Sequence, residues 1–136
     1  MISLTLPLPP SMNSYWRSAT TKPKQFGRGM RLAQKAMSPI TVYISEKGQQ
    51  FRTEVIAAVL QARANKKLTG RLQVDLVIHP ADKRVQDIDN RIKATLDALT
   101  HAGVYADDSQ IDRLIVCRGE IIKGGQCQVL ITELQG

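Results

Sequence analysis

Apolar and polar residues alternate in two segments of the chain, and this alternation predicts β-strands. The first segment covers residues 2–6 and is followed by Pro7; the second covers residues 72–79 and is followed by Pro80. Successive side chains of a strand point to opposite sides, so each segment should bury one face. A proline cannot donate a backbone hydrogen bond to a sheet, so each proline should end its strand.

Two other segments carry apolar residues at helical spacing. The first should begin after Ser45, whose hydroxyl can accept a backbone N–H, and run to about Ala64. The second should be capped by Asp89 or Asn90 and end before Gly103, because glycine suits the left-handed conformation that often follows a helix. We therefore expect two main helices.

The C-terminal part of the chain predicts a β-hairpin. A strand from about residue 111 to 122 precedes the turn at 123–126, and residues 127–133 should form the return strand. The glycine pair in the turn is typical of a two-residue connection between antiparallel neighbours. Both faces of this hairpin are partly apolar, so one face should be buried between two subunits. One face carries Ile115, Cys117 and Leu130, and the other carries Leu114, Val116 and Ile131.

These elements together predict an α+β fold. We expect a single domain over residues 1–136, in which two main helices pack on one face of a mixed or antiparallel sheet of about four strands. The stretch from residue 11 to 39 fits neither period, and no acidic residue precedes Glu46. Residues 17–39 are therefore predicted to be a long, flexible, basic loop. Its basic residues are Arg17, Lys22, Lys24, Arg28, Arg31 and Lys35.

Composition narrows the class of partner. The hydrophobic fraction of 43% is ordinary for a folded protein, and the formal net charge of +7 favours a polyanion, with nucleic acid ahead of an anionic membrane. No apolar run approaches the roughly 20 residues that span a bilayer, and the N-terminus has no signal-peptide pattern, so we expect a cytoplasmic protein with no membrane partner. The two cysteines form no metal-binding motif and are expected to be buried thiols.

Half of the acidic residues are concentrated in one short region, which is unusual in so basic a chain. Asp87 and Asp89 are two residues apart at a strand-to-helix junction, so in an extended backbone both would point to the same side. Asp107 and Asp108 follow the helix, and the five residues after Gly103 span at most about 17 Å, so the chain can return along the helix. The complete set is Asp87, Asp89, Asp97, Asp107, Asp108 and Asp112.

Converging carboxylates require a cation, because two unit charges about 4 Å apart repel by on the order of 4 kcal/mol at an effective dielectric constant of 20. Ligands that are all oxygen suit Mg²⁺ or Mn²⁺. Lys93 lies one helical turn after Asp89, and a lysine beside a hard metal suits phosphodiester hydrolysis. The alternative is structural: Asp89 only caps the helix, and Lys93 pairs with Asp89 and Asp97 on its surface.

Four ordered blocks of the sequence resemble the RusA family of Holliday-junction resolvases. They are Asp87-Ile88-Asp89-Asn90-Arg91-Ile92-Lys93, Leu96-Asp97-Ala98-Leu99, Gly103-Val104 and Asp107-Asp108-Ser109-Gln110-Ile111. The segment from Leu6 to Asn13 and the run Lys123-Gly124-Gly125 are also similar to that family. The basic stretch from Arg17 to Pro39 matches least.

The resemblance implies a dimeric endonuclease, of a kind often carried by prophages, that resolves four-way DNA junctions with Mg²⁺ or Mn²⁺. It implies that Asp87, Asp89 and Asp108 are the essential carboxylates, that Lys93 is the essential lysine, and that Asp107 is a neighbouring acid of the metal site. The cations expected to contact DNA are Arg17, Lys22, Lys24, Arg28, Arg31, Lys83, Arg84 and Arg91.

Two other functions fit the same residues: a basic DNA-binding module without catalysis, and a nuclease that prefers flaps or other branched DNA. Smaller features also have two interpretations. Trp16 could stack on an exposed base at a junction, or it could anchor the basic loop to the core. Leu96 stands where an aromatic residue could act as a wedge. His79 and His101 are expected at the surface or at a helix end, and Tyr43 and Phe51 are expected in the core.

Overall fold

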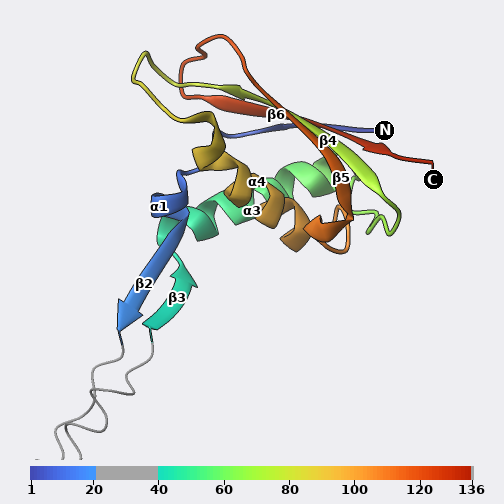
Figure 1. Cartoon of the computed structure of the whole chain (residues 1–136), viewed down its shortest axis with the longest axis horizontal. Helices are drawn as coiled ribbons and strands as arrows, with labels where there is room; N and C mark the ends of the chain where they lie inside the picture. The colour runs from blue at the N-terminus through green and yellow to red at the C-terminus, as the bar shows by residue number, and fades with distance from the viewer. Residues whose placement is uncertain (21–39, 136) are drawn as a thin grey trace, which may run out of the picture.

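The computed structural model describes residues 1–20 and 40–135. Two helices lie beneath a twisted sheet, and a two-stranded hairpin extends away from them (Figure 1). In chain order the elements are β1 (Ile2–Leu6), α1 (Met12–Tyr15), β2 (Trp16–Thr20), β3 (Ile40–Ile44), α3 (Glu46–Gln61), β4 (Leu72–His79), the 3₁₀ turn η1 (Ile88–Arg91), α4 (Ile92–His101), the 3₁₀ turn η2 (Asp108–Gln110), β5 (Ile111–Arg118) and β6 (Gln126–Glu133).

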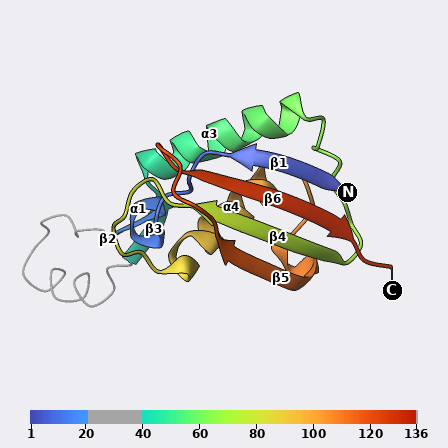
Figure 2. The ribbon, with the colours of Figure 1, turned by 90° about the horizontal axis from the view of Figure 1, so that it is seen from above.

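The main sheet has the strand order β1-β6-β4-β5. β4 pairs in parallel with β5 and antiparallel with β6, and β6 pairs antiparallel with β1, so the sheet is mixed. Both long helices cover the same face of this sheet, as Figure 2 shows from above. The predicted α+β architecture, with about four strands and two helices on one face, is confirmed.

The hydrophobic pattern accounts for the elements around the core. Alternate residues of β1 and β4 are buried, as predicted from their period of two. Helix α3 begins after Ser45, whose hydroxyl accepts a hydrogen bond from the backbone N–H of Gly48 at 3.1 Å. Phe51 is buried as expected, but 49% of Tyr43 is exposed, so the prediction of a core position for Tyr43 was wrong. The core is formed mainly by Leu4, Leu6, Phe51, Val55, Val59, Leu72, Val74, Leu76, Ala98, Leu99, Val129 and Ile131.

The predicted C-terminal hairpin is wrong, because β5 and β6 are not neighbours. β4 lies between them and forms a ladder with each. The first strand also ends at Arg118, four residues before the expected position. The following segment crosses the end of β4, where the N–H of Gly119 donates to the carbonyl of Ile78 and that of Ile122 to Pro80, both at 2.9 Å. The glycine pair still turns the chain, with positive φ angles of 84° and 76°, but within this longer connection.

The predicted irregular structure at the N-terminus is wrong for residues 12–20. The Ser11 hydroxyl accepts a hydrogen bond from the N–H of Ser14 at 3.3 Å and starts the single turn α1. The next five residues form β2, which pairs antiparallel with β3. Thr20 lies opposite Ile40, so the partner strand is distant in sequence and a local pattern does not reveal it. The rest of the predicted basic loop, residues 21–39, lies outside the described residues.

No helix or strand of the described residues covers the face of the sheet away from the helices, and this face is called the open face. Asp75 of β4 lies between Ile115 of β5 and Leu130 of β6, and all three point to this open face. The second apolar set of the sequence, which includes Ile131, faces the helices instead. Cys117 is exposed and Cys127 is buried, so only Cys127 fulfils the expectation of a buried thiol. Within the described part of the chain, no helix has the length and apolar character that a membrane crossing requires.

Candidate active site

Asp87 and Asp89 lie in the segment that connects β4 to α4. Asp87 immediately precedes η1 and Asp89 lies within it, and both side chains are exposed. Neither carboxylate makes a hydrogen bond or an ion pair with any side chain or backbone group in the described ranges. The prediction that Asp89 or Asn90 caps the helix was wrong: α4 begins at Ile92 without a side-chain cap, because the 3₁₀ turn occupies the preceding residues. The carboxylates are therefore placed at the helix start but are not used to cap it.

The chain then returns along α4, as the spacing allowed. Gly103 adopts a left-handed conformation with φ of +83° and turns the backbone at the end of the helix. The hydroxyl of Tyr105 donates a hydrogen bond to the carbonyl of Leu96 at 2.8 Å, so the returning segment is held against the middle of the helix. The Lys93 ammonium lies 3.2 Å from a carboxylate oxygen of Asp108. The second acidic block thus comes back to the first turn of α4.

The turn η2 that carries Asp108 is held by a buried glutamine. The Gln110 side chain accepts from the N–H of Asp107 and donates to the carbonyls of Leu68 and Gly70, all at 2.8 Å. The Asp107 carboxylate accepts from the N–H of Ser109. Hydrogen bonding by the Ser109 side chain, and then by its backbone N–H, lowers the pKa of Asp107. Sequence reasoning did not assign this anchoring role to Gln110, although the fourth block contains the residue.

Asp97, which the sequence grouped with the acidic cluster, belongs to a separate network. Tyr15 donates its hydroxyl hydrogen bond to Asp97, and Arg52 donates both to the Tyr15 oxygen, at 2.8 Å, and to Asp97. Burial alone would raise the pKa of Asp97, but the hydrogen bonds from Tyr15 and Arg52, aided by the charges of Arg52 and Lys93, hold it below its usual value. The alternative pairing of Lys93 with Asp89 and Asp97 was wrong, because Lys93 pairs with Asp108.

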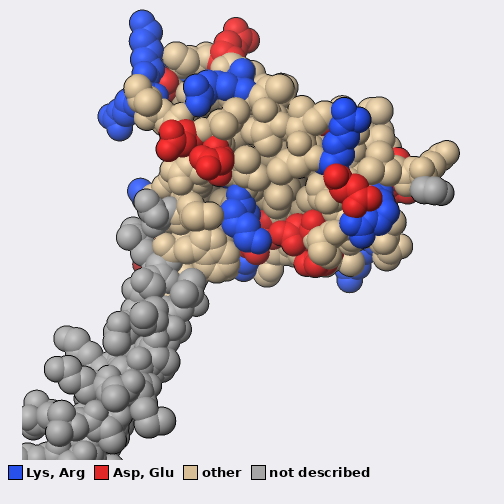
Figure 3. Space-filling view, viewed as in Figure 1, with Lys and Arg blue, Asp and Glu red and all other residues tan. Residues whose placement is uncertain are grey.

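The donor set fits a hard divalent cation, because every candidate ligand is a carboxylate. Among the described residues, however, no three His, Cys, Asp or Glu side chains lie close enough together to hold a metal ion. The structure brings Asp108 to Lys93 but does not close Asp87, Asp89 and Asp108 into one ligand group. Acidic side chains occupy separate patches on the face seen in Figure 3, with basic side chains between them.

The family model for the endodeoxyribonuclease RusA matches residues 7–131 of the chain. The chain belongs to the RusA family. It is 36% identical over 130 residues to the crossover junction endodeoxyribonuclease rusA of Enterobacteria phage HK97, which covers 96% of this chain and 92% of the phage protein. It is 33% identical over 132 residues to the RusA enzyme of Escherichia coli strain K12, which covers 97% of this chain and 94% of that enzyme.

The basic residues of this RusA-family chain differ in how they are used. Lys83 and Arg84 are exposed on the loop before η1. Arg91 is partly buried, and it donates to the side chain of Gln86 at 3.0 and 2.8 Å and to the carbonyl of Pro9. Arg91 therefore fastens the loop that leads to the acidic site, and its DNA contact remains a prediction. Arg17 lies in β2, but its side chain is outside the described part of the structure. Four further predicted contacts lie wholly outside the described residues: Lys22, Lys24, Arg28 and Arg31.

Three smaller expectations have mixed outcomes in this RusA-family structure. His101 is exposed in the last turn of α4, as expected. His79 is buried beside the carbonyl of Glu120, with 2.9 Å between that oxygen and Nδ1, so its expected surface position was wrong. Leu96, the possible wedge, is half-buried and packs against the hydrophobic core.

Proposed function

We propose that this protein is a divalent-metal-dependent endonuclease that cuts four-way DNA junctions by paired, symmetric nicks. Its membership of the RusA family, over nearly the whole chain, is the observation that carries the proposal. Relatives at 33–36% identity are named crossover junction endodeoxyribonucleases. DNA endonuclease activity on crossover junctions follows from this membership; the metal, the ligands and the paired nicks are our proposals. Such an enzyme would act on DNA in the cytoplasm.

Asp87, Asp89 and Asp108 would hold Mg²⁺, or Mn²⁺ in its place, with Asp107 as a neighbouring acid. The bound metal supplies an activated water and neutralises charge on the phosphate. Lys93 holds the Asp108 carboxylate at 3.2 Å and presents a fixed positive charge at the start of α4. Half of the Lys93 side chain is exposed, so its ammonium can also reach a phosphate oxygen and stabilise developing negative charge.

Binding would depend on the basic surface rather than on the carboxylates. Lys83 and Arg84 lie on the loop that leads directly to Asp87. Together with the basic residues of the segment 17–39, they supply charges that neutralise phosphates and release counterions. The affinity for junction DNA should therefore fall steeply as the salt concentration rises.

We propose that the protein acts as a homodimer, because two symmetric nicks in one junction require two active sites related by a two-fold axis. The open face of the sheet is the surface that we assign to the interface, since Val116 and Ile131 of the other apolar set already pack in the core on the helix side of the sheet. It exposes Ile115 and Cys117 and has a hollow beside Leu130. A standard interface buries about 1,600 Å² in total. Light scattering should give twice the chain mass of 15.1 kDa, and Leu130→Asp should give one chain mass.

The experiment that tests the function compares three synthetic substrates: a four-way junction, a flap and a linear duplex of the same length. With Mg²⁺ the protein should nick the junction in preference to the other two, and without a divalent metal it should bind the junction but not cut it. Binding without cutting under every metal condition would support a DNA-binding module. Preferred cutting of the flap would support a nuclease of different specificity.

A further inference from the structure

An open groove of about 530 Å³ lies beside the base of the β2–β3 hairpin. Helix α3 forms the floor of the groove, and the β2–β3 hairpin forms its wall. The last turn of α4 lies at its far end. The volume is in the range of pockets that hold small organic ligands. The side chains that matter for its chemistry are Trp16, Tyr43, Gln49, Arg52, Thr53 and His101.

The wall of the groove is aromatic. Trp16 is only partly buried, and it meets the fully buried Tyr15 in a T-shaped contact with 5.1 Å between ring centroids. Tyr43 lies on the neighbouring strand opposite Arg17, so its side chain points to the other face of the strand pair from Trp16, and 49% of it is exposed. Tyr15 fixes the position of Trp16, and the Trp16 ring remains partly accessible. Partly exposed aromatic rings of this kind are typical of binding surfaces.

The floor of the groove carries little net charge. Arg52 is the one lysine or arginine among the described residues that line the groove, and its guanidinium is already paired with Asp97 and bonded to the Tyr15 hydroxyl. The Gln49 side chain donates to a backbone carbonyl at 3.3 Å, and the Thr53 hydroxyl donates within the helix at 3.0 Å. Aromatic surface with amide, hydroxyl and imidazole groups suits an uncharged planar ring that has hydrogen-bonding edges. It does not suit a phosphate.

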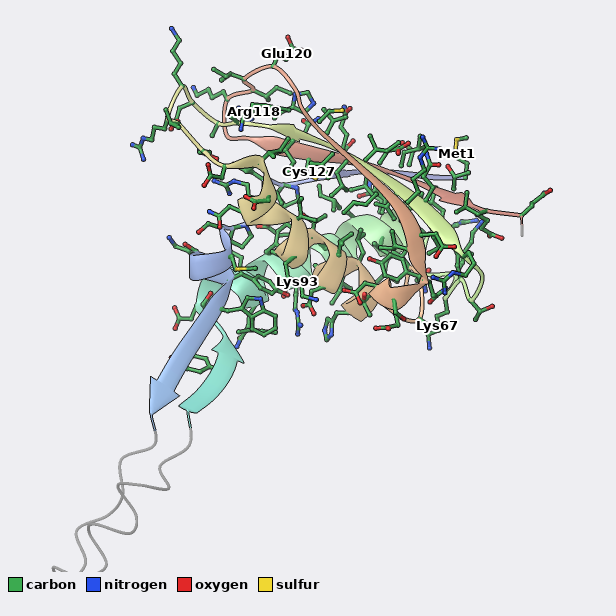
Figure 4. All side chains as sticks on the ribbon, in the orientation of Figure 1. Met1, Lys67, Lys93, Arg118, Glu120 and Cys127 are labelled. Atoms are coloured by element: carbon green, nitrogen blue, oxygen red, sulfur yellow. The ribbon has the colours of Figure 1, made fainter. Side chains whose placement is uncertain are left out.

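The groove and Lys93 lie along one side of α4. Lys93, Asp97 and His101 follow one another at four-residue intervals and so lie along one side of the helix. Eight residues of helix span about 12 Å, which is roughly three to four nucleotides at the rise of one DNA strand. Figure 4 shows Lys93 on the side of α4 toward which the β2–β3 hairpin extends. A strand cut beside Lys93 can therefore reach the groove.

We propose that this groove binds one unstacked DNA base near the branch point, on the ring of Trp16. The inference rests on the proposed function, because a crossover interrupts the continuous base stack of the exchanging strands. Stacking on aromatic rings tolerates any base, so the subsite selects branched over linear DNA without reading its sequence. In this proposal both interpretations of Trp16 hold, because the residue is anchored by Tyr15 and also contacts DNA.

Trp16 is the only tryptophan of the chain, so its fluorescence reports on the groove alone. Wild-type protein is titrated, without divalent metal, with a four-way junction and with a linear duplex, and binding is followed separately by anisotropy of labelled DNA. At equal saturation the junction should quench Trp16 emission at least twofold more than the duplex. A junction with abasic sites at the nucleotides around the branch point should bind but lose this quenching. Equal quenching by all three DNAs would overturn the proposal.

Variants test the same contact by cleavage. Trp16→Leu keeps an apolar side chain against Tyr15 but removes the stacking surface, and Trp16→Phe keeps a ring. We expect Trp16→Leu to weaken junction binding about tenfold, Trp16→Phe to restore most of it, and neither to change duplex binding. Tyr43→Ala removes an exposed ring on the other face of the strand pair and should leave junction binding unchanged. Leu60→Ala, an equally exposed apolar site at the end of α3, is the control and should change nothing.

These results separate the subsite from the proposed function. If wild-type protein with Mg²⁺ does not cut the junction, the proposed function fails whatever the fluorescence shows. If it cuts the junction while Trp16 emission is insensitive to the branch point and Trp16→Leu binds normally, only the subsite is wrong. Should Trp16→Leu fail to fold, the wild-type titration with the junction, the duplex and the abasic junction still decides the question.

Discussion

Removing the Asp97 carboxylate should destabilise the protein far more than removing a carboxylate from its surface. Asp97 accepts hydrogen bonds from Tyr15 of α1 and from Arg52 of α3, and so ties three helices together. The ion-pair side chains of Arg52 and Asp97 are only 20% and 24% exposed, and Tyr15 is fully buried. In Asp97→Ala the guanidinium and the phenol both lose their shared acceptor.

The expected loss can be estimated from this burial. Breaking a fully buried ion pair costs about 3–5 kcal/mol, whereas an exposed pair contributes about 0–1 kcal/mol. Arg52 and Asp97 lie between these limits but nearer to the buried one, and the Tyr15 hydroxyl adds an unsatisfied buried group. We therefore expect the free energy of unfolding to fall by about 2–3 kcal/mol, and the Tm to fall by about 10 °C for a chain of this length.

Urea unfolding followed by circular dichroism measures this loss. The matched control is Asp112→Ala, because Asp112 pairs with Arg71 while both side chains are about half exposed, at 46% and 52%. The control should lose no more than about 0.5 kcal/mol. Tyr15→Phe in both backgrounds completes a double-mutant cycle, which should give a coupling energy of about 1 kcal/mol or more. Equal losses for the two aspartate variants would refute the argument from burial.

Three other predictions concern the active site and the same tyrosine. Asp87→Asn, Asp89→Asn and Asp108→Asn should each slow junction cleavage by about 100-fold or more while gel-shift binding survives, because the metal is lost and the basic surface is kept. Lys93→Ala should be as slow, and Lys93→Arg should recover little in the same assay, because a guanidinium does not fit the position of a compact ammonium. Burial and the hydrogen bond to Asp97 raise the pKa of Tyr15 from 10.0 to about 12. The contribution of the Tyr15 hydroxyl to stability is therefore complete below pH 10.0 and is lost as the pH rises through about 12. Urea unfolding in that pH range should show this loss, and Tyr15→Phe should lack it.

The elements around the core could be predicted because a local pattern determines them. The alternation in residues 2–6 and 72–79, and the serine that caps α3, each place an element within a few residues. The strand order could not be predicted in this way. A glycine pair between two apolar strands favours a hairpin, but β4 gains a ladder on each side when the chain crosses over its end, and that gain depends on residues distant in sequence.

For the candidate site, spacing predicted only that the second pair of aspartates could return along the helix. Spacing alone left open whether Asp108 returns to the helix start, and the structure shows that it does, through Tyr105 and Lys93. The role of Asp97 was missed, because its partners Tyr15 and Arg52 come from two elements more than 40 residues earlier in the chain. A cluster of aspartates in sequence therefore contains residues of two different networks in space.

Cleavage of a cruciform in a supercoiled plasmid tests the central claim most directly. A junction enzyme that makes two paired nicks within one encounter converts this plasmid to a linear product, whereas independent single nicks relax the cruciform and leave a nicked circle. With Mg²⁺ we predict mainly linear DNA from the wild-type protein, cut at the cruciform, and no cutting by Asp108→Asn. A product that is mainly nicked circle, or cutting at sites away from the cruciform, would contradict the account.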